Sequence, residues 1–117
     1  MSWQKIRYFI FSLIQRKQLI DFLKLPTTGL IKNSQAYYAV YSYNSYMKMS
    51  KVKLSPKRLE VKIRIPETLD GIPLLEKNWP NIIDKISRLN LRRYTLSSDK
   101  TSDPNYYIIE GTRKWWA

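Results

Sequence analysis

The sequence predicts an α+β fold, in which an N-terminal amphipathic helix and a basic arm precede a small β-α-β-β domain. Apolar residues recur at helical spacing near the N-terminus and again over 80–90, whereas over 58–65 they alternate with charged residues. The 117 residues suffice for one compact domain. We therefore expect residues 1–57 to form the helix and a basic, aromatic arm, and residues 58–117 to form the compact α+β core of one domain.

The N-terminal helix is predicted from the apolar pattern of residues 2–14. Its apolar face contains Trp3, Ile6, Ile10, Leu13 and Ile14, and the polar residues Gln4, Lys5, Ser12 and Gln15 lie opposite. The apolar pattern resumes over 19–23 after a polar patch, so the segment is one helix with a basic belt or two short helices. Pro26 ends it.

The arm follows as an aromatic stretch and a basic stretch. Residues 35–47 contain five of the nine tyrosines. Because aromatic residues favour strands, this stretch predicts a strand with aromatic rings on both faces. Residues 48–57 are interpreted as a basic link, since they show no apolar period.

The core opens with the clearest element of the chain. In residues 58–65 four aliphatic side chains alternate with four charged ones, which predicts a strand with one buried face that ends at Pro66. Asp70 and Gly71 indicate a turn. A helix is predicted over 80–90, with Pro80 near its first turn and Asn90 just past its end.

Two further strands complete the predicted core. They cover residues 92–96 and 106–110, and the polar residues between them form the loop of a wide hairpin. The region 58–110 is therefore expected to run strand, helix, strand, strand.

Positive charge dominates the first half of the chain. The net charge is +12, and residues 1–59 contain eleven basic side chains against one acid, Asp21. Residues 60–117 contain ten basic and eight acidic side chains. Such an excess attracts phosphate-rich partners, although a solvated surface is the alternative. The first twenty residues, with four basic groups and no acid, also resemble a mitochondrial presequence.

Catalytic chemistry has little support. The chain has no Cys and no His, which excludes thiolate chemistry, imidazole catalysis and Cys or His zinc sites. Only three glycines are present, and they form no phosphate-binding loop. Glu60 and Lys62 have the spacing of some metal-dependent nucleases, but alternation makes them part of a solvated strand face. We expect no enzyme activity, cofactor, metal or small-molecule substrate.

Basic and aromatic residues instead indicate RNA binding, with cations along the phosphates and rings stacked on bases. The RNA-binding candidates are Arg16, Lys17, Lys48, Lys51, Lys53, Lys57, Arg58, Arg92, Arg93, Arg113 and Lys114. The candidates for base stacking or a protein interface are Tyr41, Tyr43, Tyr46, Trp115 and Trp116. The alternatives are that the tyrosines and tryptophans close the core, and that Arg92 and Arg93 complement the negative end of the preceding helix.

The sequence therefore predicts a structural RNA-binding protein, such as a ribosomal protein that contacts rRNA and neighbouring proteins in a large assembly. The presequence-like start and a composition rich in Lys, Ile, Tyr and Asn favour a mitochondrial or other organellar ribosome over the cytoplasm. Three alternatives stay open. They are a DNA-binding regulatory or phage-type accessory protein, a peripheral membrane protein that uses the N-terminal helix, and a protein-interaction module.

Overall fold

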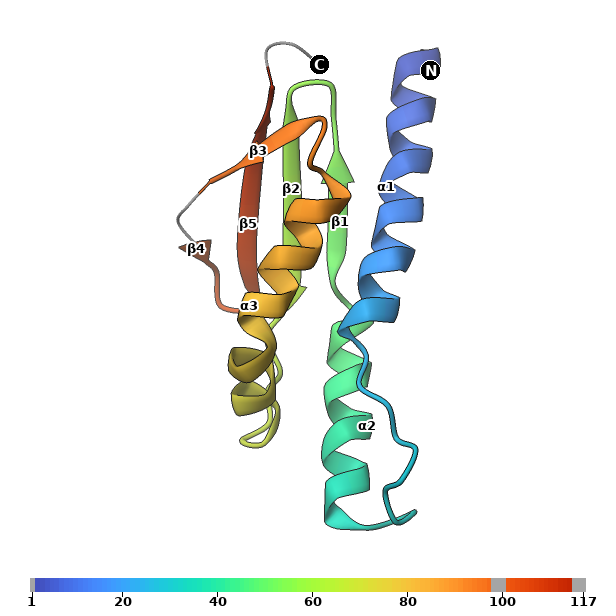
Figure 1. The fold of residues 1–117 in the computed structure, drawn as a ribbon, viewed down its shortest axis with the longest axis vertical. Coiled ribbons are helices and arrows are strands. Elements are labelled where there is room, and N and C mark those ends of the chain that lie inside the picture. Colours follow the sequence, from blue (N-terminus) through green and yellow to red (C-terminus); the bar gives the residue numbers. More distant parts are fainter. Residues whose placement is uncertain (1, 98–100, 115–117) are drawn as a thin grey trace.

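The computed structural model describes residues 2–97 and 101–114, which form an elongated body of about 50 × 28 × 24 Å. Helix α3 covers one face of an antiparallel sheet, α1 runs beside one edge of that sheet, and α2 extends beyond its end (Figure 1). The elements are α1 (Trp3–Leu23), α2 (Gln35–Met47), β1 (Lys51–Leu54), β2 (Arg58–Arg64), α3 (Gly71–Leu89), β3 (Tyr94–Leu96), β4 (Thr101–Ser102) and β5 (Tyr106–Arg113). The predicted α+β fold with an N-terminal helix is confirmed.

The sheet has the strand order β1-β2-β5-β3, and β4 also pairs with β5. Every pairing is antiparallel. The expected order of strand, helix, strand and strand in the second half is confirmed by β2, α3, β3 and β5. The pairing of β3 with β5 confirms the wide hairpin, and the short β4 lies within its predicted loop.

Strand β2 follows the predicted alternation. Leu59, Val61 and Ile63 are buried on the face toward α3, and the intervening charged residues lie on the other face. These three residues belong to one buried cluster that also contains side chains from α1, α2, α3 and β5. Burial of a large aliphatic side chain is worth about 1.5–3 kcal/mol, so this alternation fixes which face of the sheet becomes the core.

The predicted strand over 35–47 is wrong, because this segment forms helix α2. Ser34 caps the helix by accepting a hydrogen bond from the Tyr37 amide. Tyr43 and Met47, one turn apart, are completely buried. Spacing of four residues therefore decides the structure here, and the preference of tyrosine for strands is overridden.

The basic link predicted over 48–57 is also wrong, because it contains strand β1. Val52 and Leu54 face the core while Lys51 and Lys53 face away, a period of two over only four residues. A tight turn returns the chain to β2, with the Ser55 amide donating to the Arg58 carbonyl at 2.9 Å. Pairing with β2 thus makes the lysines part of the sheet.

Helix α1 is a single helix whose apolar face is not the side that packs on the core. Tyr8, Gln15, Leu19 and Leu23 are buried on the inner side, whereas most of the predicted apolar face is exposed. Polar groups stabilise the inner side, since the Gln15 and Asn90 amides bond to each other at 2.8 and 3.0 Å. Helix α1 packs on this side, and not on its predicted apolar face, because these polar groups find hydrogen-bond partners far along the chain.

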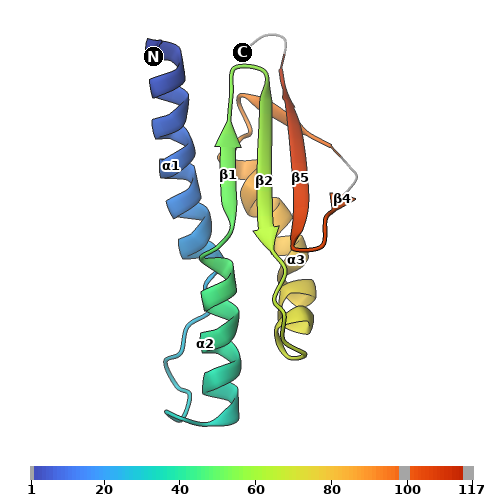
Figure 2. The ribbon, with the colours of Figure 1, turned by 180° about the vertical axis from the view of Figure 1, so that it is seen from behind.

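Helix α1 also protects the edge of the sheet. The Ser12 hydroxyl accepts a hydrogen bond from the Leu54 amide at 2.9 Å and donates to the Tyr8 carbonyl at 2.7 Å. An uncovered edge strand invites pairing with another chain, and α1 occupies that position along β1 (Figure 2).

Helix α3 begins at Gly71, so Pro80 lies in its interior and not in its first turn as predicted. Asn90 directly follows the last helical residue, as predicted. Gly71 is required by space, because a Cβ there would lie 2.5 Å from the Pro66 Cβ. The Thr68 hydroxyl accepts a hydrogen bond from the Gly71 amide and thereby starts the helix.

Candidate nucleic-acid interface

The face of the sheet opposite α3 is not covered by any described helix (Figure 2). We call it the open face, and its strand residues, placed by the register, are Lys51, Lys53, Arg58, Glu60, Lys62, Arg64, Thr95, Thr101, Tyr106, Ile108, Glu110 and Thr112. Five of these are basic and two are acidic. The open face therefore has an excess of positive charge and a tyrosine, Tyr106, at one end.

Three cations surround the ring of Tyr106. The Lys51 and Lys62 Nζ atoms lie 5.4 and 5.9 Å from the ring centroid, and the Arg64 Cζ lies at 5.8 Å. The register explains this convergence, since Arg64 pairs with Tyr106 across β2 and β5, and Lys51 pairs with Lys62 across β1 and β2. The electron-rich ring offsets part of the repulsion among the three charges.

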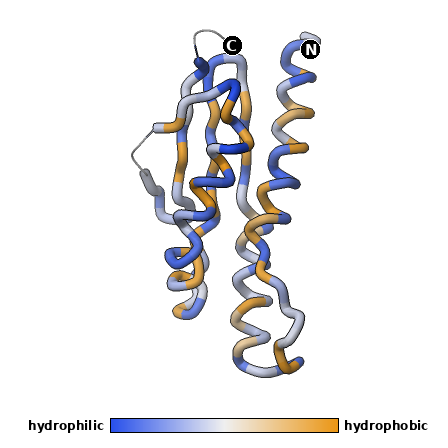
Figure 3. The backbone as a smooth tube through the Cα atoms, viewed as in Figure 1, coloured by the Kyte–Doolittle hydropathy of each residue, from blue (hydrophilic) through white to orange (hydrophobic). Residues whose placement is uncertain are grey.

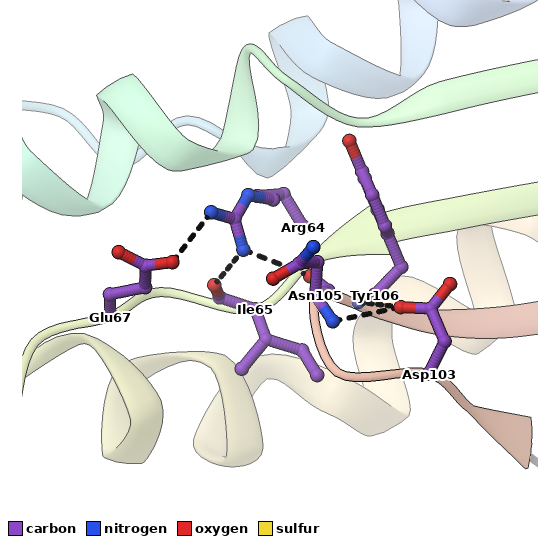
Figure 4. A network of polar contacts seen from close by, with 6 residues as sticks. All are labelled: Arg64, Ile65, Glu67, Asp103, Asn105 and Tyr106. Atoms are coloured by element: carbon purple, nitrogen blue, oxygen red, sulfur yellow. Dashed lines mark hydrogen bonds and ion pairs between the residues drawn. The ribbon is translucent and has the colours of Figure 1, made fainter.

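Arg64 is held in place by several groups (Figure 4). Its guanidinium donates to the carbonyls of Ile65 and Asn105 at 3.1 and 3.2 Å and to the Glu67 carboxylate at 2.9 Å. The Tyr46 ring lies on its other side, with the Arg64 Cζ 5.4 Å from the ring centroid. Arg64 is buried and fully engaged, so it positions Tyr106 and adds charge beneath the surface.

The turn before β5 fixes the start of that strand. The Asp103 carboxylate accepts hydrogen bonds from the amides of Asn105 and Tyr106 at 2.8 and 2.7 Å (Figure 4). The bond from the Asn105 amide is the main cause that holds the pKa of Asp103 below its ordinary value. The charged carboxylate therefore anchors the backbone of Tyr106.

The acidic residues of the open face neutralise little of its charge. Glu60 lies 3.9 Å from the Lys62 Nζ, and Glu110 lies 3.8 Å from the Arg58 guanidinium, and both pairs are solvent-exposed or nearly so. Exposed pairs at such distances are worth little. Lys51 and Lys53 form no ion pair with any residue of the described ranges 2–97 and 101–114. Both lysines are exposed to solvent.

A groove continues this surface between β1 and α1. It has a volume of about 470 Å³ and is mainly apolar, and Lys5 and Lys53 line it from opposite sides. Phe9, Leu13 and Pro56 supply apolar walls. The groove thus combines apolar walls with one lysine from α1 and one from β1.

The structure places the other predicted cations of the first half as follows. Arg16 is engaged, because it donates to the carbonyls of Ser50 and Lys48 at 2.9 and 2.6 Å. Lys17 pairs with Asp21 at 3.1 Å on the outer side of α1. Lys48 and Lys57 are exposed, at the end of α2 and in the turn between β1 and β2. Only Lys51, Lys53 and Arg58 of the predicted set belong to the open face.

A second basic corner lies between α3 and β3, away from the open face. Arg92 and Arg93 are exposed there, and the Arg93 Cζ lies 5.0 Å from the Phe11 ring centroid. Arg113 donates to the Tyr8 hydroxyl at 2.7 Å, and Lys114 donates to the Leu91 carbonyl. Arg92 and Arg93 precede β3 instead of starting it as predicted, near the carbonyl end of α3.

The aromatic candidates are placed in three different ways. Tyr43 is completely buried, so its ring belongs to the core, and burial raises the pKa of its hydroxyl. Tyr41 is exposed on α2, stacked at 6.4 Å against Tyr37, and Tyr46 contacts Arg64. Trp115 and Trp116 lie outside the described residues.

Sequence reasoning missed Lys62, Arg64 and Tyr106. The alternation over 58–65 already placed the first two on one strand face. Tyr106 joined them only through the pairing of β2 with β5, which the sequence did not reveal.

Comparisons with protein-family models, curated proteins and solved structures give no match. In the described part of the chain, acidic side chains form no group of three that could hold a metal ion. None of the described helices combines the length and the apolar character of a membrane span.

Proposed function

We propose that this protein binds single-stranded RNA on the open face of its sheet. The observation that carries the proposal is the convergence of Lys51, Lys62 and Arg64 on the Tyr106 ring, with Lys53 beside them; Lys51 and Lys53 form no ion pair within the described ranges. Sheets that bind single-stranded RNA use aromatic rings for base stacking and cations for the backbone. Both kinds of group are present here on one uncovered surface.

The uneven distribution of charge between the two halves of the chain also supports this proposal. Among the described residues, Arg58 is the only basic side chain of residues 1–59 that pairs with a carboxylate from the second half. Apart from Arg58, and from Lys17 with its partner Asp21, the basic side chains of the first half form no ion pair within the described residues. A polyanion can compensate this positive charge and release its own counterions, which is the main source of sequence-independent affinity.

We further propose a structural role in an RNA–protein particle, with a ribosome, organellar ribosomes included, as the first candidate. The small size and the charge of +12 support this role. Co-sedimentation of the tagged protein with ribosomal particles, abolished by nuclease treatment, is the expected result. Sedimentation that nuclease leaves unchanged would show that protein contacts alone retain it.

Binding of fluorescent single-stranded RNA at several salt concentrations tests the RNA proposal directly. The variant Lys51→Gln/Lys53→Gln removes two exposed cations of the open face. We expect about tenfold weaker binding and a salt slope lower by about 1.4, at roughly 0.7 per phosphate contact on a single strand. The matched control is Lys32→Gln/Lys77→Gln, which removes the same charge from exposed positions outside the open face.

Equal losses in the two double variants would mean that net charge alone attracts RNA, and the open face would not be the site. Tyr106→Leu tests stacking separately, because leucine keeps apolar volume but loses the ring. We expect it to cost about 1–3 kcal/mol of binding free energy. Tighter binding of duplex DNA than of single-stranded RNA would favour the DNA-binding alternative.

A further inference from the structure

The outer side of α1 carries an uncovered row of large apolar side chains. We call it the α1 stripe, and its members are Trp3, Ile6, Phe9, Ile10, Leu13 and Ile14. Five of the six, Ile6 being the exception, are 45–73% exposed. Their spacing of three and four residues places them along one side of the helix. Figure 3 shows apolar positions recurring among polar ones along α1.

The stripe is not needed for the packing of α1. The opposite side of the helix makes that contact, through buried Tyr8, Gln15, Leu19 and Leu23. A contiguous exposed patch of large apolar side chains on a folded protein marks an interaction site. Among the described residues, no helix or strand runs along the side of α1 that faces away from the sheet (Figures 1 and 2).

The charges beside the stripe are all positive over most of the helix. Lys5, Arg7, Arg16 and Lys17 lie on α1, and the first acid is Asp21, which pairs with Lys17. Lys53 faces the same region across the groove. This combination of an apolar stripe with cationic flanks is complementary to a surface that is apolar inside and negatively charged outside.

A second copy of the chain would bring the same cations against each other, which opposes dimerisation through the stripe. The stripe also covers only residues 3–14, about 18 Å of helix, against roughly 30 Å for the hydrocarbon core of a bilayer. A helix of this kind lies in the plane of the membrane surface.

We propose that α1 docks through this stripe on the surface of an anionic lipid bilayer. Trp3, Phe9 and Ile10 enter the boundary between headgroups and acyl chains, and the cations beside them on the first turns, Lys5 and Arg7, contact lipid phosphates and carboxylates. This surface meets the open face only at the groove between α1 and β1, and the inference does not depend on RNA binding. The protein would then present the open face from a membrane-bound position.

Flotation with lipid vesicles tests the proposal, using the full chain. We expect binding to phosphatidylcholine vesicles that contain about 30% phosphatidylserine, and at least about tenfold weaker binding to pure phosphatidylcholine vesicles. The variant Trp3→Ser/Ile10→Ser changes two exposed positions without touching the core. We expect it to lose at least about tenfold in vesicle affinity while its RNA binding and its helical circular dichroism stay unchanged.

The control variant is Lys51→Gln/Lys62→Gln, which removes two cations of the open face that lie outside the groove and is expected to keep its vesicle affinity within about threefold while losing RNA affinity. Vesicle binding that survives the α1 change, or that does not distinguish anionic from neutral vesicles, would overturn the proposal. So would a dimer in sedimentation that the α1 change dissolves, because a second copy would then occupy the stripe.

Discussion

The amide pair between Gln15 and Asn90 gives the sharpest test of how α1 is held on the core. The two side chains are 7% and 4% exposed and form reciprocal hydrogen bonds of 3.0 and 2.8 Å. Asn90 also donates to the Ile86 carbonyl at 2.8 Å. Gln15→Ala removes two of these bonds and leaves the Asn90 carbonyl oxygen without its partner. A buried polar group that loses its partner costs about 1–3 kcal/mol.

A groove of about 420 Å³ is lined by both residues, so water can reach the orphaned group, and we place the cost of Gln15→Ala near the middle of that range, at about 2 kcal/mol. Asn90→Ala removes all three bonds and should cost about 3 kcal/mol. The double variant should cost clearly less than the sum, with a coupling of about 2 kcal/mol, since neither partner is then left unpaired.

Urea unfolding followed by circular dichroism measures the free energies of unfolding. Gln18→Ala, an exposed glutamine on the same helix, is the control and should change stability by less than about 0.5 kcal/mol. If the two single changes add without coupling, water already satisfies both amides and α1 is held by its apolar contacts alone. That result would refute the explanation given for its reversed faces.

Three further predictions concern single positions. Gly71→Ala should destabilise the protein by about 1–3 kcal/mol in urea unfolding, because the new Cβ would meet Pro66 at 2.5 Å; an unchanged midpoint would show that this turn is free to move. The depressed pKa of Asp103 gives stability that is present above its unfolded pKa and lost as the pH falls through the folded pKa. The unfolding midpoint of Asp103→Asn should therefore fall less with acid below about pH 4 than that of the wild type, and parallel curves would contradict this. Tyr43→Phe removes a buried hydroxyl that makes no hydrogen bond of regular geometry in the described residues, although the Asn78 side chain lies near enough to offset part of the rise that burial causes in its pKa; the thermal midpoint should stay level or rise, and a clear fall would show that Asn78 bonds to the hydroxyl.

The parts of the fold that the sequence predicted are those in which one pattern dominates. The alternation over 58–65 has no competing interpretation, and β2 follows it from Leu59 to Ile63. No single pattern dominates the tyrosine-rich segment, because the strand preference of tyrosine and the helical spacing of Tyr43 and Met47 predict different structures. Burial of these two side chains is worth more than the propensity difference, which spans only about 1 kcal/mol per residue.

Helix α1 was misjudged for a different reason. Both of its sides contain apolar residues, so the sequence could not say which side meets the core. Contacts with residues far along the chain determine which side is buried, since Gln15 bonds to a residue 75 positions away and Ser12 to one 42 positions away. Patterns within a short window do not contain this information.

The candidate site was predicted in part, and the missing part has the same origin. Lys51, Lys53 and Arg58 were identified from local charge, and they do lie on the open face. The ring that organises this surface is Tyr106, which reaches it through pairing of strands that are 42 residues apart at Arg64 and Tyr106. The pairing register of β2 and β5, and not the local composition, therefore brings the Tyr106 cluster together.

The two proposed surfaces share an edge, and this has a measurable consequence. The groove between α1 and β1 is lined by Phe9 and Leu13 of the stripe and by Lys53 of the open face, with Lys5 between them. The Tyr106 cluster lies outside the groove, so most of the open face stays accessible when the stripe is covered. We therefore expect anionic vesicles to weaken RNA binding by less than about tenfold, with RNA carried along in vesicle flotation. Complete mutual exclusion would mean that RNA and lipid use the same cations, and one of the two surfaces would have to be reassigned.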